Sequence, residues 1–424
     1  MLQENLFQFI WQYSLYNPVD LKTTNGNSIT IIHPGRLNIH AGPDFEEAKI
    51  KIGNTTLIGN VELHTKASDW TKHQHQHNQG YQNIILHVVY EDDAPGTEHP
   101  FAKLVMKPHI PDYVLDRYTH LLHTSHHIPC ASQLDKVPVI IKEAQLNRML
   151  AERWELKLQD WNDLLAQSAG NWLDVFYWRL AVNFGFKVNA APFLQLARSI
   201  PFHLFARHRE SLLQTEALLF GQAGMLEGSF KDDYPRLLQR EYTFLKAKYQ
   251  LQPLAKHQWK FLRLRPVNFP TIRIAQFAAL LHQSLHLFSH TLEAQTVDRL
   301  RNLLNVTASD YWMDHYRFDE AHDKPLRKKL GMASVDNIII NTVAPVRFLF
   351  AHHQGHLSEQ EKALHLLSHI APEQNNILRL WNDSGWGAIN AAQSQALIQL
   401  YTHYCSRKRC LECAIGLSII KRNT

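Results

Sequence analysis

The chain has 424 residues, of which 45% are hydrophobic and 20% are charged, and its formal net charge is +5 at pH 7. This composition excludes a disordered or fibrous chain, and the mildly basic balance permits a polyanionic partner without requiring one. The N-terminus lacks a basic leader before its apolar residues and no apolar run reaches the ~18 residues of a membrane span, so we expect a cytoplasmic protein with no membrane partner.

The first part of the chain carries the signals of a mixed β-sheet. Apolar residues recur at helical spacing within residues 3–16, which predicts a short opening helix. Strand patterns follow around Asn25-Gly26 and Gly53-Asn54, which are turn dipeptides of two hairpins. Further strands are expected at 83–91 and 102–110, ahead of another helix.

From about Lys142 the pattern becomes helical, and apolar residues follow one face of each predicted helix. The fold class we predict is therefore α+β. It combines a β-rich domain at residues 1–128 with a larger all-helical domain at residues 129–424.

Two carboxylates and an imidazole lie near the second hairpin. Glu62 and His64 project from the same face of a strand, because residues two apart share a face. A strict two-residue turn would place Asp44 across from Leu63, on the wrong face. A bulge at Gly59, or a three-residue loop, would instead bring Asp44 opposite His64. A shared site therefore requires a bulged hairpin or a longer loop.

If these three side chains converge, they can bind a divalent cation. Carboxylates favour Mg²⁺ or Mn²⁺, and the histidine shifts the preference toward Mn²⁺ or Zn²⁺. Such an ion lowers the pKa of a bound water and stabilises charge on a phosphoryl group. The alternative is that Asp44 caps the turn after Gly42-Pro43, while Glu62 and His64 lie on a solvated strand face.

The order helix, three strands, helix, strand resembles the αβββαβ order of the PD-(D/E)xK nuclease superfamily. Asp44 follows a proline ahead of one strand, and Glu62 lies in the next. The resemblance implies metal binding by Asp44 and Glu62, an accessory role for Glu4, and hydrolysis of phosphodiesters in DNA or RNA. His64 stands where the superfamily has lysine, and an imidazole can accept a proton or bind metal but lacks lysine's fixed charge. Asp44, Glu62 and His64 are thus the expected catalytic residues.

A second resemblance covers nearly the whole chain. The chain is similar to an uncharacterised bacterial family, known only as a domain of unknown function, in the segments GPDFEEAKI, GNVELHTKASDWTKHQHQHNQGYQNIILHVV, LRPVNFPTIRIAQFA and YCSRKRCLECAIG. That resemblance implies no activity.

The segment DWTKHQHQH places His73, His75 and His77 at alternating positions. In an extended segment all three share a face and could join His64 at a metal site. In a helix, His73 and His77 have the spacing of helical zinc sites. The alternative is a solvated polar connection. His87, inside an apolar strand, is expected to be a hydrogen-bonded core histidine.

The cysteines form a second candidate metal site. Cys405, Cys410 and Cys413 follow the pattern C-x₄-C-x₂-C, and Cys130 is the one other cysteine of the sequence. Because cytoplasmic disulfides are disfavoured, four thiolates would bind Zn²⁺ or a [4Fe–4S] cluster and join the two ends of the helical domain. One early and three late cysteines are similar to helicase-linked PD-(D/E)xK nucleases that carry such a cluster. The alternative is a set of independent buried or reactive thiols.

A basic, aromatic segment lies in the helical domain. In HQWKFLRLRPVNFPTIR, aromatic residues alternate with Lys260, Arg263, Arg265 and Arg273, a composition that suits phosphate contacts and base stacking on a nucleic acid. The alternative is a turn held by arginine hydrogen bonds to backbone carbonyls.

Three functions fit this sequence. A metal-dependent nuclease or nuclease-like protein is the one we favour. A catalytically inactive nucleic-acid-binding module and a metal-stapled protein-interaction scaffold are the alternatives.

Overall fold

The computed structural model of the protein describes residues 2–96, 100–284 and 286–422. The chain divides into two compact units. Unit 1 comprises Met1–Gln145, Asp383–Trp386 and Leu400–Thr424, and unit 2 comprises Leu146–Asn382 and Gly387–Gln399. The domain boundary predicted near residue 128 lies inside unit 1. Among the described residues, no helix has both the length and the apolar character to cross a membrane.

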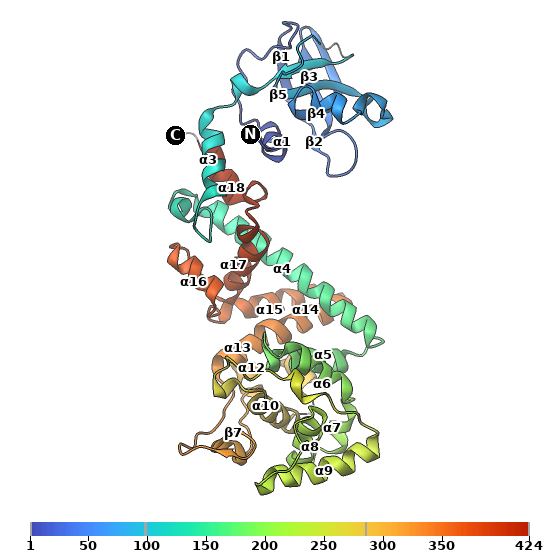
Figure 1. Cartoon of the computed structure of the whole chain (residues 1–424), viewed down its shortest axis with the longest axis vertical. Coiled ribbons are helices and arrows are strands. Elements are labelled where there is room, and N and C mark those ends of the chain that lie inside the picture. Colours follow the sequence, from blue (N-terminus) through green and yellow to red (C-terminus); the bar gives the residue numbers. More distant parts are fainter. Residues whose placement is uncertain (1, 97–99, 285, 423–424) are drawn as a thin grey trace. The chain divides into compact units, whose positions relative to one another are not determined.

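Unit 1 contains the mixed β-sheet that the sequence predicts, and the α+β class is confirmed (Figure 1). Its strand order is β1-β3-β4-β5-β6, with the short β2 paired to β3. β3 is antiparallel to both of its main neighbours, whereas β4, β5 and β6 are parallel. The strands are β1 (Ile29–His33), β2 (Arg36–Leu37), β3 (Phe45–Ile52), β4 (Thr55–Lys66), β5 (Ile84–Glu91) and β6 (Ala102–Val105).

The hairpin of β3 and β4 has a two-residue turn and a bulge in β3. Ala48 pairs with Gly59, but Phe45 pairs with Val61, so β3 has one residue more than β4 between these two pairs. Glu47, within that interval, has a left-handed backbone with φ 55°. The extra residue shifts the pairing register, relative to β4, of the residues that precede it in β3.

The expected bulge at Gly59 is therefore wrong, because the extra residue lies in the opposite strand. The register places Asp44 opposite Glu62 rather than opposite His64. Gly59 has a different role. A Cβ at this position would come within 2.5 Å of Ile85 Cγ2, so the lack of a side chain lets β5 approach β4 closely.

Helices flank the sheet and extend unit 1. The first helix packs against β4, and the third packs beside the last, although these two are far apart in sequence (Figure 1). The helices of unit 1 are α1 (Glu4–Gln12), α2 (Asp69–Lys72), α3 (Asp112–His123), α18 (Ala414–Lys421) and the first turns of α4 (Val139–Gln167).

Unit 2 is built almost entirely of helices around a large apolar core, in which α10 is buried along most of its length. Its elements are α5 (Trp172–Gly185), α6 (Ala190–Ser199), α7 (His203–Arg207), α8 (Leu212–Gln222), α9 (Asp233–Tyr249), α10 (Pro270–Gln283), α11 (Leu287–Glu293), α12 (Val297–Leu303), β7 (His315–Arg317), β8 (Glu320–Ala321), α13 (Met332–Ile338), α14 (Ala344–His353), α15 (Leu357–Leu366), with most of α16 (Asn376–Asp383) and α17 (Ala391–His403).

Candidate metal centre

Strand β4 supplies the first two side chains of the site. Glu62 and His64 project from the same face, as the strand alternation predicts, and are only 4% and 2% exposed. Glu62 Oε1 lies 3.5 Å from His64 Nε2. This face of the strand is buried, so the solvated alternative does not apply to either residue.

The segment after β4 supplies two further histidines. It is neither extended nor one helix: α2 ends at Lys72, Gln74 adopts a left-handed backbone with φ 59°, and His75 begins a 3₁₀ turn. This reversal brings His73 and His75 to His64, whereas His77 remains exposed. Two of the three histidines in this run therefore lie near His64.

The three imidazoles meet at one point. One ring nitrogen each from His64, His73 and His75 lies within 4.8 Å of the other two, and no other described residues bring three histidine, cysteine or carboxylate ligand atoms so close together. The ring centroids are 5.1 to 5.4 Å apart. Glu62 Oε1 lies 3.3 Å from His75 Nε2, which adds a carboxylate oxygen to the set.

Two of these nitrogens, His64 Nε2 and His75 Nε2, are buried and face Glu62 Oε1 without making a hydrogen bond within the described residues. The other nitrogen of His64, Nδ1, lies 2.9 Å from His87 Nε2, which fixes the ring with Nε2 toward the cluster. An imidazole held in this way is typical of a metal ligand. His87 is a hydrogen-bonded core histidine, as predicted.

Two aromatic residues hold the histidine segment in place. Tyr81 stacks on His75 with ring centroids 4.1 Å apart, and its hydroxyl donates to the carbonyl of Gly42. Trp70 is buried and packs against both His75 and His64. Neither aromatic residue is among the site residues predicted from the sequence. Their positions on either side of the run of histidines are the one available signal.

Asp44 lies beside Glu62, but its carboxylate does not face His64. The backbone N–H of Asp44 donates to Glu62 Oε2 over 3.1 Å. Its own carboxylate accepts from the backbone N–H of Leu63 at 2.9 Å and from Gln8 Nε2 at 2.8 Å. The Asp44 backbone therefore contacts one oxygen of Glu62, whereas the other oxygen faces the imidazoles, and the convergence of Asp44, Glu62 and His64 on one cation stays a prediction.

The electrostatics of this region favour an added positive charge. Burial raises the pKa of Glu62, and the charges of Asp44 and Glu4 raise it further. Burial also raises the pKa of Asp44, and Glu4 adds to that effect. Burial, with His75 and His73 nearby, lowers the pKa of His64 to about 3. Glu4 is therefore near the acidic pair, and burial favours the neutral form of His64.

The basic segment of unit 2 is only partly available to a nucleic acid. Lys260, Arg263 and Arg265 are exposed. Arg273 is buried, and its guanidinium donates to Gln276, Asn268 and Ser334 while it covers the ring of Phe186. This side chain holds neighbouring segments of unit 2 together, and its predicted role in nucleic-acid binding stays a prediction.

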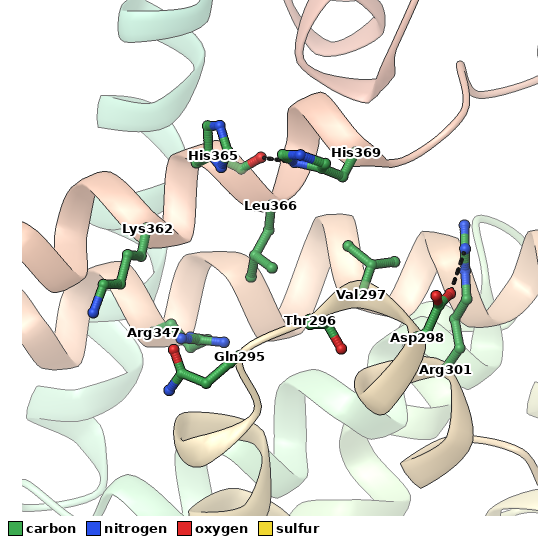
Figure 2. A pocket seen from close by; sticks show the side chains of 10 residues that line it. All are labelled: Gln295, Thr296, Val297, Asp298, Arg301, Arg347, Lys362, His365, Leu366 and His369. Atoms are coloured by element: carbon green, nitrogen blue, oxygen red, sulfur yellow. Dashed lines mark hydrogen bonds and ion pairs between the residues drawn. The ribbon is translucent and has the colours of Figure 1, made fainter.

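Unit 2 also contains a cavity of about 530 Å³ with several basic lining residues (Figure 2). Most of these charges already have partners. Arg301 makes two hydrogen bonds to Asp336, and Lys362 pairs with Glu359. Arg347 donates to the carbonyl of Ala294. The cavity is lined by Gln295, Thr296, Val297, Asp298, Arg301, Arg347, Lys362, His365, Leu366 and His369.

The four cysteines are all buried and all belong to unit 1.

Comparison with known proteins adds a family but no function. No curated protein and no solved structure matches the chain. Residues 4–376 match the family model described as "Protein of unknown function (DUF2851)", and the chain therefore belongs to the DUF2851 family.

Proposed function

We propose that unit 1 is a divalent-metal-dependent hydrolase of phosphodiesters. Its metal ligands are His64, His73 and His75, with Glu62 as the carboxylate beside them. The observation that carries this proposal is the meeting of three imidazole nitrogens within 4.8 Å of one another, with Glu62 Oε1 3.3 Å from one of them. Three histidines with one further position are a common catalytic zinc arrangement.

The ligand types fit Zn²⁺ or Mn²⁺ better than Mg²⁺, because imidazole nitrogen outnumbers oxygen. A cation held there would polarise a phosphoryl group and activate water for attack. Glu62 has one oxygen, Oε2, engaged by the Asp44 backbone, which leaves Oε1 directed at the imidazoles and able to accept a proton. Asp44 and Glu4 form the acidic side, where Mg²⁺ or Mn²⁺ is the matching ion.

The substrate class is supported by the order of elements. α1, β1, β3, β4, α2 and β5 follow the αβββαβ order, apart from the short β2. Asp44 directly precedes β3, and Glu62 lies in β4. These placements support a phosphodiester substrate in DNA or RNA through resemblance to the PD-(D/E)xK superfamily.

A second function, nucleic-acid binding without cleavage, is favoured by a separate observation. Lys260, Arg263 and Arg265 are exposed in one short segment of unit 2. Exposed lysine and arginine bind phosphates with an affinity that falls steeply as salt increases.

The test compares cleavage of a plasmid and of a single-stranded oligonucleotide by the full-length protein, with Mn²⁺, Zn²⁺ or Mg²⁺ added. His75→Gln, Glu62→Gln and Asp44→Ala are assayed beside the matched control His77→Gln, because His77 belongs to the same run but lies outside the cluster. We expect His75→Gln and Glu62→Gln to lose about 100-fold or more of the activity.

Equal cleavage by His75→Gln and His77→Gln would refute the proposed ligands. Salt-sensitive binding with no cleavage by the wild-type protein would select the binding module. If neither cleavage nor binding is observed, the interaction scaffold is what remains.

A further inference from the structure

The second feature of unit 1 is a cluster of buried cysteines contributed by two distant parts of the chain. Cys130 directly precedes the 3₁₀ segment Ala131–Lys136. Cys405 and Cys410 each begin a 3₁₀ turn, and Cys413 precedes α18. All four side chains are buried, and no disulfide joins them within the described residues.

The segments that carry these cysteines lie together, because α18 contacts both the 3₁₀ segment that follows Cys130 and the 3₁₀ turn that begins at Cys410. Four independent buried thiols would be expected at separate places in the core. Here the chain brings together one thiol from the segment before α4 and three from its C-terminal part.

The backbone around the late cysteines is shaped to hold the sulfurs together. Lys408 has a left-handed backbone with φ 54°, which closes the turn between Cys405 and Cys410. Gly416 allows α18 to lie against the second turn, because a Cβ there would come within 2.1 Å of the Cys410 carbonyl oxygen. The N–H of Ala414 donates to Gln145 Oε1. These contacts hold the two 3₁₀ turns in place, and none of them involves a sulfur atom.

We propose that Cys130, Cys405, Cys410 and Cys413 bind a metal centre through four thiolates and thereby join the C-terminal segment to the rest of unit 1. Metal binding stabilises the thiolate form of buried cysteines. The centre is structural, because four protein ligands leave no position for a substrate.

Two centres share this chemistry, a single Zn²⁺ ion and an iron–sulfur cluster. Tetrahedral zinc holds its sulfur ligands about 3.8 Å apart, given Zn–S bonds of about 2.3 Å. A [4Fe–4S] cluster is also bound by four cysteine thiolates, so metal analysis is needed to separate the two centres.

The experiment measures zinc, iron and acid-labile sulfide in the full-length protein purified without oxygen. The variants are Cys410→Ser, His64→Gln and the control Ser406→Ala, which changes an exposed residue of the neighbouring turn Cys405–Arg407. Zinc near one equivalent supports a single ion, and iron with sulfide and visible absorbance supports a cluster. In either case Cys410→Ser must lose that metal, while His64→Gln and Ser406→Ala must retain it.

A second measurement avoids variants that fail to fold. An organic mercurial added to the wild-type protein should release the metal in proportion to the thiols it modifies. Protein that contains no thiol-released metal, or a Cys410→Ser variant that retains the full content, would overturn the proposal. This outcome does not depend on the histidine cluster of unit 1, because His64→Gln removes only the metal proposed to bind there.

Discussion

Two buried glutamates, one in each unit, show how the proposed metal site differs from another polar part of the interior. Glu62 of unit 1 is 4% exposed, Glu216 of unit 2 is 2% exposed, and burial raises the pKa of both. Their neighbours differ. The Ser309 hydroxyl donates to Glu216 Oε1 over 2.7 Å, whereas Glu62 Oε1 faces two imidazole nitrogens that make no hydrogen bond within the described residues. Burial alone therefore does not distinguish the two glutamates, and the proposal for Glu62 rests on the imidazoles around it.

The basic cavity of unit 2 gives the same contrast on a larger scale (Figure 2). It has more charged lining residues than the histidine cluster, yet Arg301 pairs with Asp336 and Lys362 pairs with Glu359. Its charges are satisfied inside the protein. The cavity therefore carries no functional assignment, and the difference from the histidine cluster can be tested by mutation.

The largest expected effect is stabilisation of unit 1 by metal. Free Zn²⁺ or Mn²⁺ at about 1,000 times its dissociation constant should raise the free energy of unfolding by about 4 kcal/mol, because the metal binds the folded state. His64→Gln should remove this gain, since it removes one of three imidazole ligands. Thermal unfolding with and without added metal measures the effect.

The control for this comparison is His77→Gln, which leaves the cluster intact and should keep the full gain. If the wild-type protein and His64→Gln respond equally to metal, the difference between Glu62 and Glu216 is not one of metal binding.

A smaller effect is expected from the glutamate of unit 2. The pKa of Glu216 is raised from 4.5 to about 7, so the folded state holds this proton more tightly than the unfolded state. Stability from the protonated form is complete below about pH 4.5, falls as pH rises, and is lost above about pH 7, a change of up to about 3 kcal/mol. Glu216→Gln should remove this dependence and stabilise the protein at about pH 8.

Chemical unfolding between about pH 5 and about pH 8 checks this sign, with the exposed Glu361→Gln as the control. Greater stability of the wild-type protein at the higher pH would contradict it. Added metal should not change the result for Glu216, which has no imidazole neighbours among its hydrogen-bond partners in the described structure.

Gly59→Ala should destabilise the strand that carries Glu62 and His64. The new Cβ would lie 2.5 Å from Ile85 Cγ2 and 2.8 Å from the Asn83 carbonyl oxygen, and relieving that overlap should cost about 2 kcal/mol. Denaturant unfolding measures the loss. Gly331→Ala, where no atom lies within 4 Å of the new Cβ, should change little. Equal effects of both substitutions would show that β5 does not constrain β4 as described.

The sequence predicts those features that depend on neighbouring residues. The Gly53-Asn54 turn and the shared face of Glu62 and His64 are local, and the structure has both. The bulge depends on the left-handed backbone of Glu47 and on long-range pairing, so its strand could not be assigned. The histidines that lie near His64 could not be predicted either. The left-handed backbone of Gln74 determines which of them reach it, and no sequence pattern requires that conformation at a glutamine.

The smallest expected effect lies at the basic cavity of unit 2. Arg301 and Asp336 are 24% and 15% exposed and form two hydrogen bonds, so Arg301→Gln should cost about 1–2 kcal/mol. Lys362→Gln breaks a more exposed pair with Glu359 and should change stability by less than about 0.5 kcal/mol. Added phosphate should stabilise neither the wild-type protein nor Lys362→Gln, because the basic groups already have partners. A clear gain in thermal stability with phosphate, lost in Arg301→Gln, would mean that this cavity binds anions and that pairing inside a protein does not exclude a binding site.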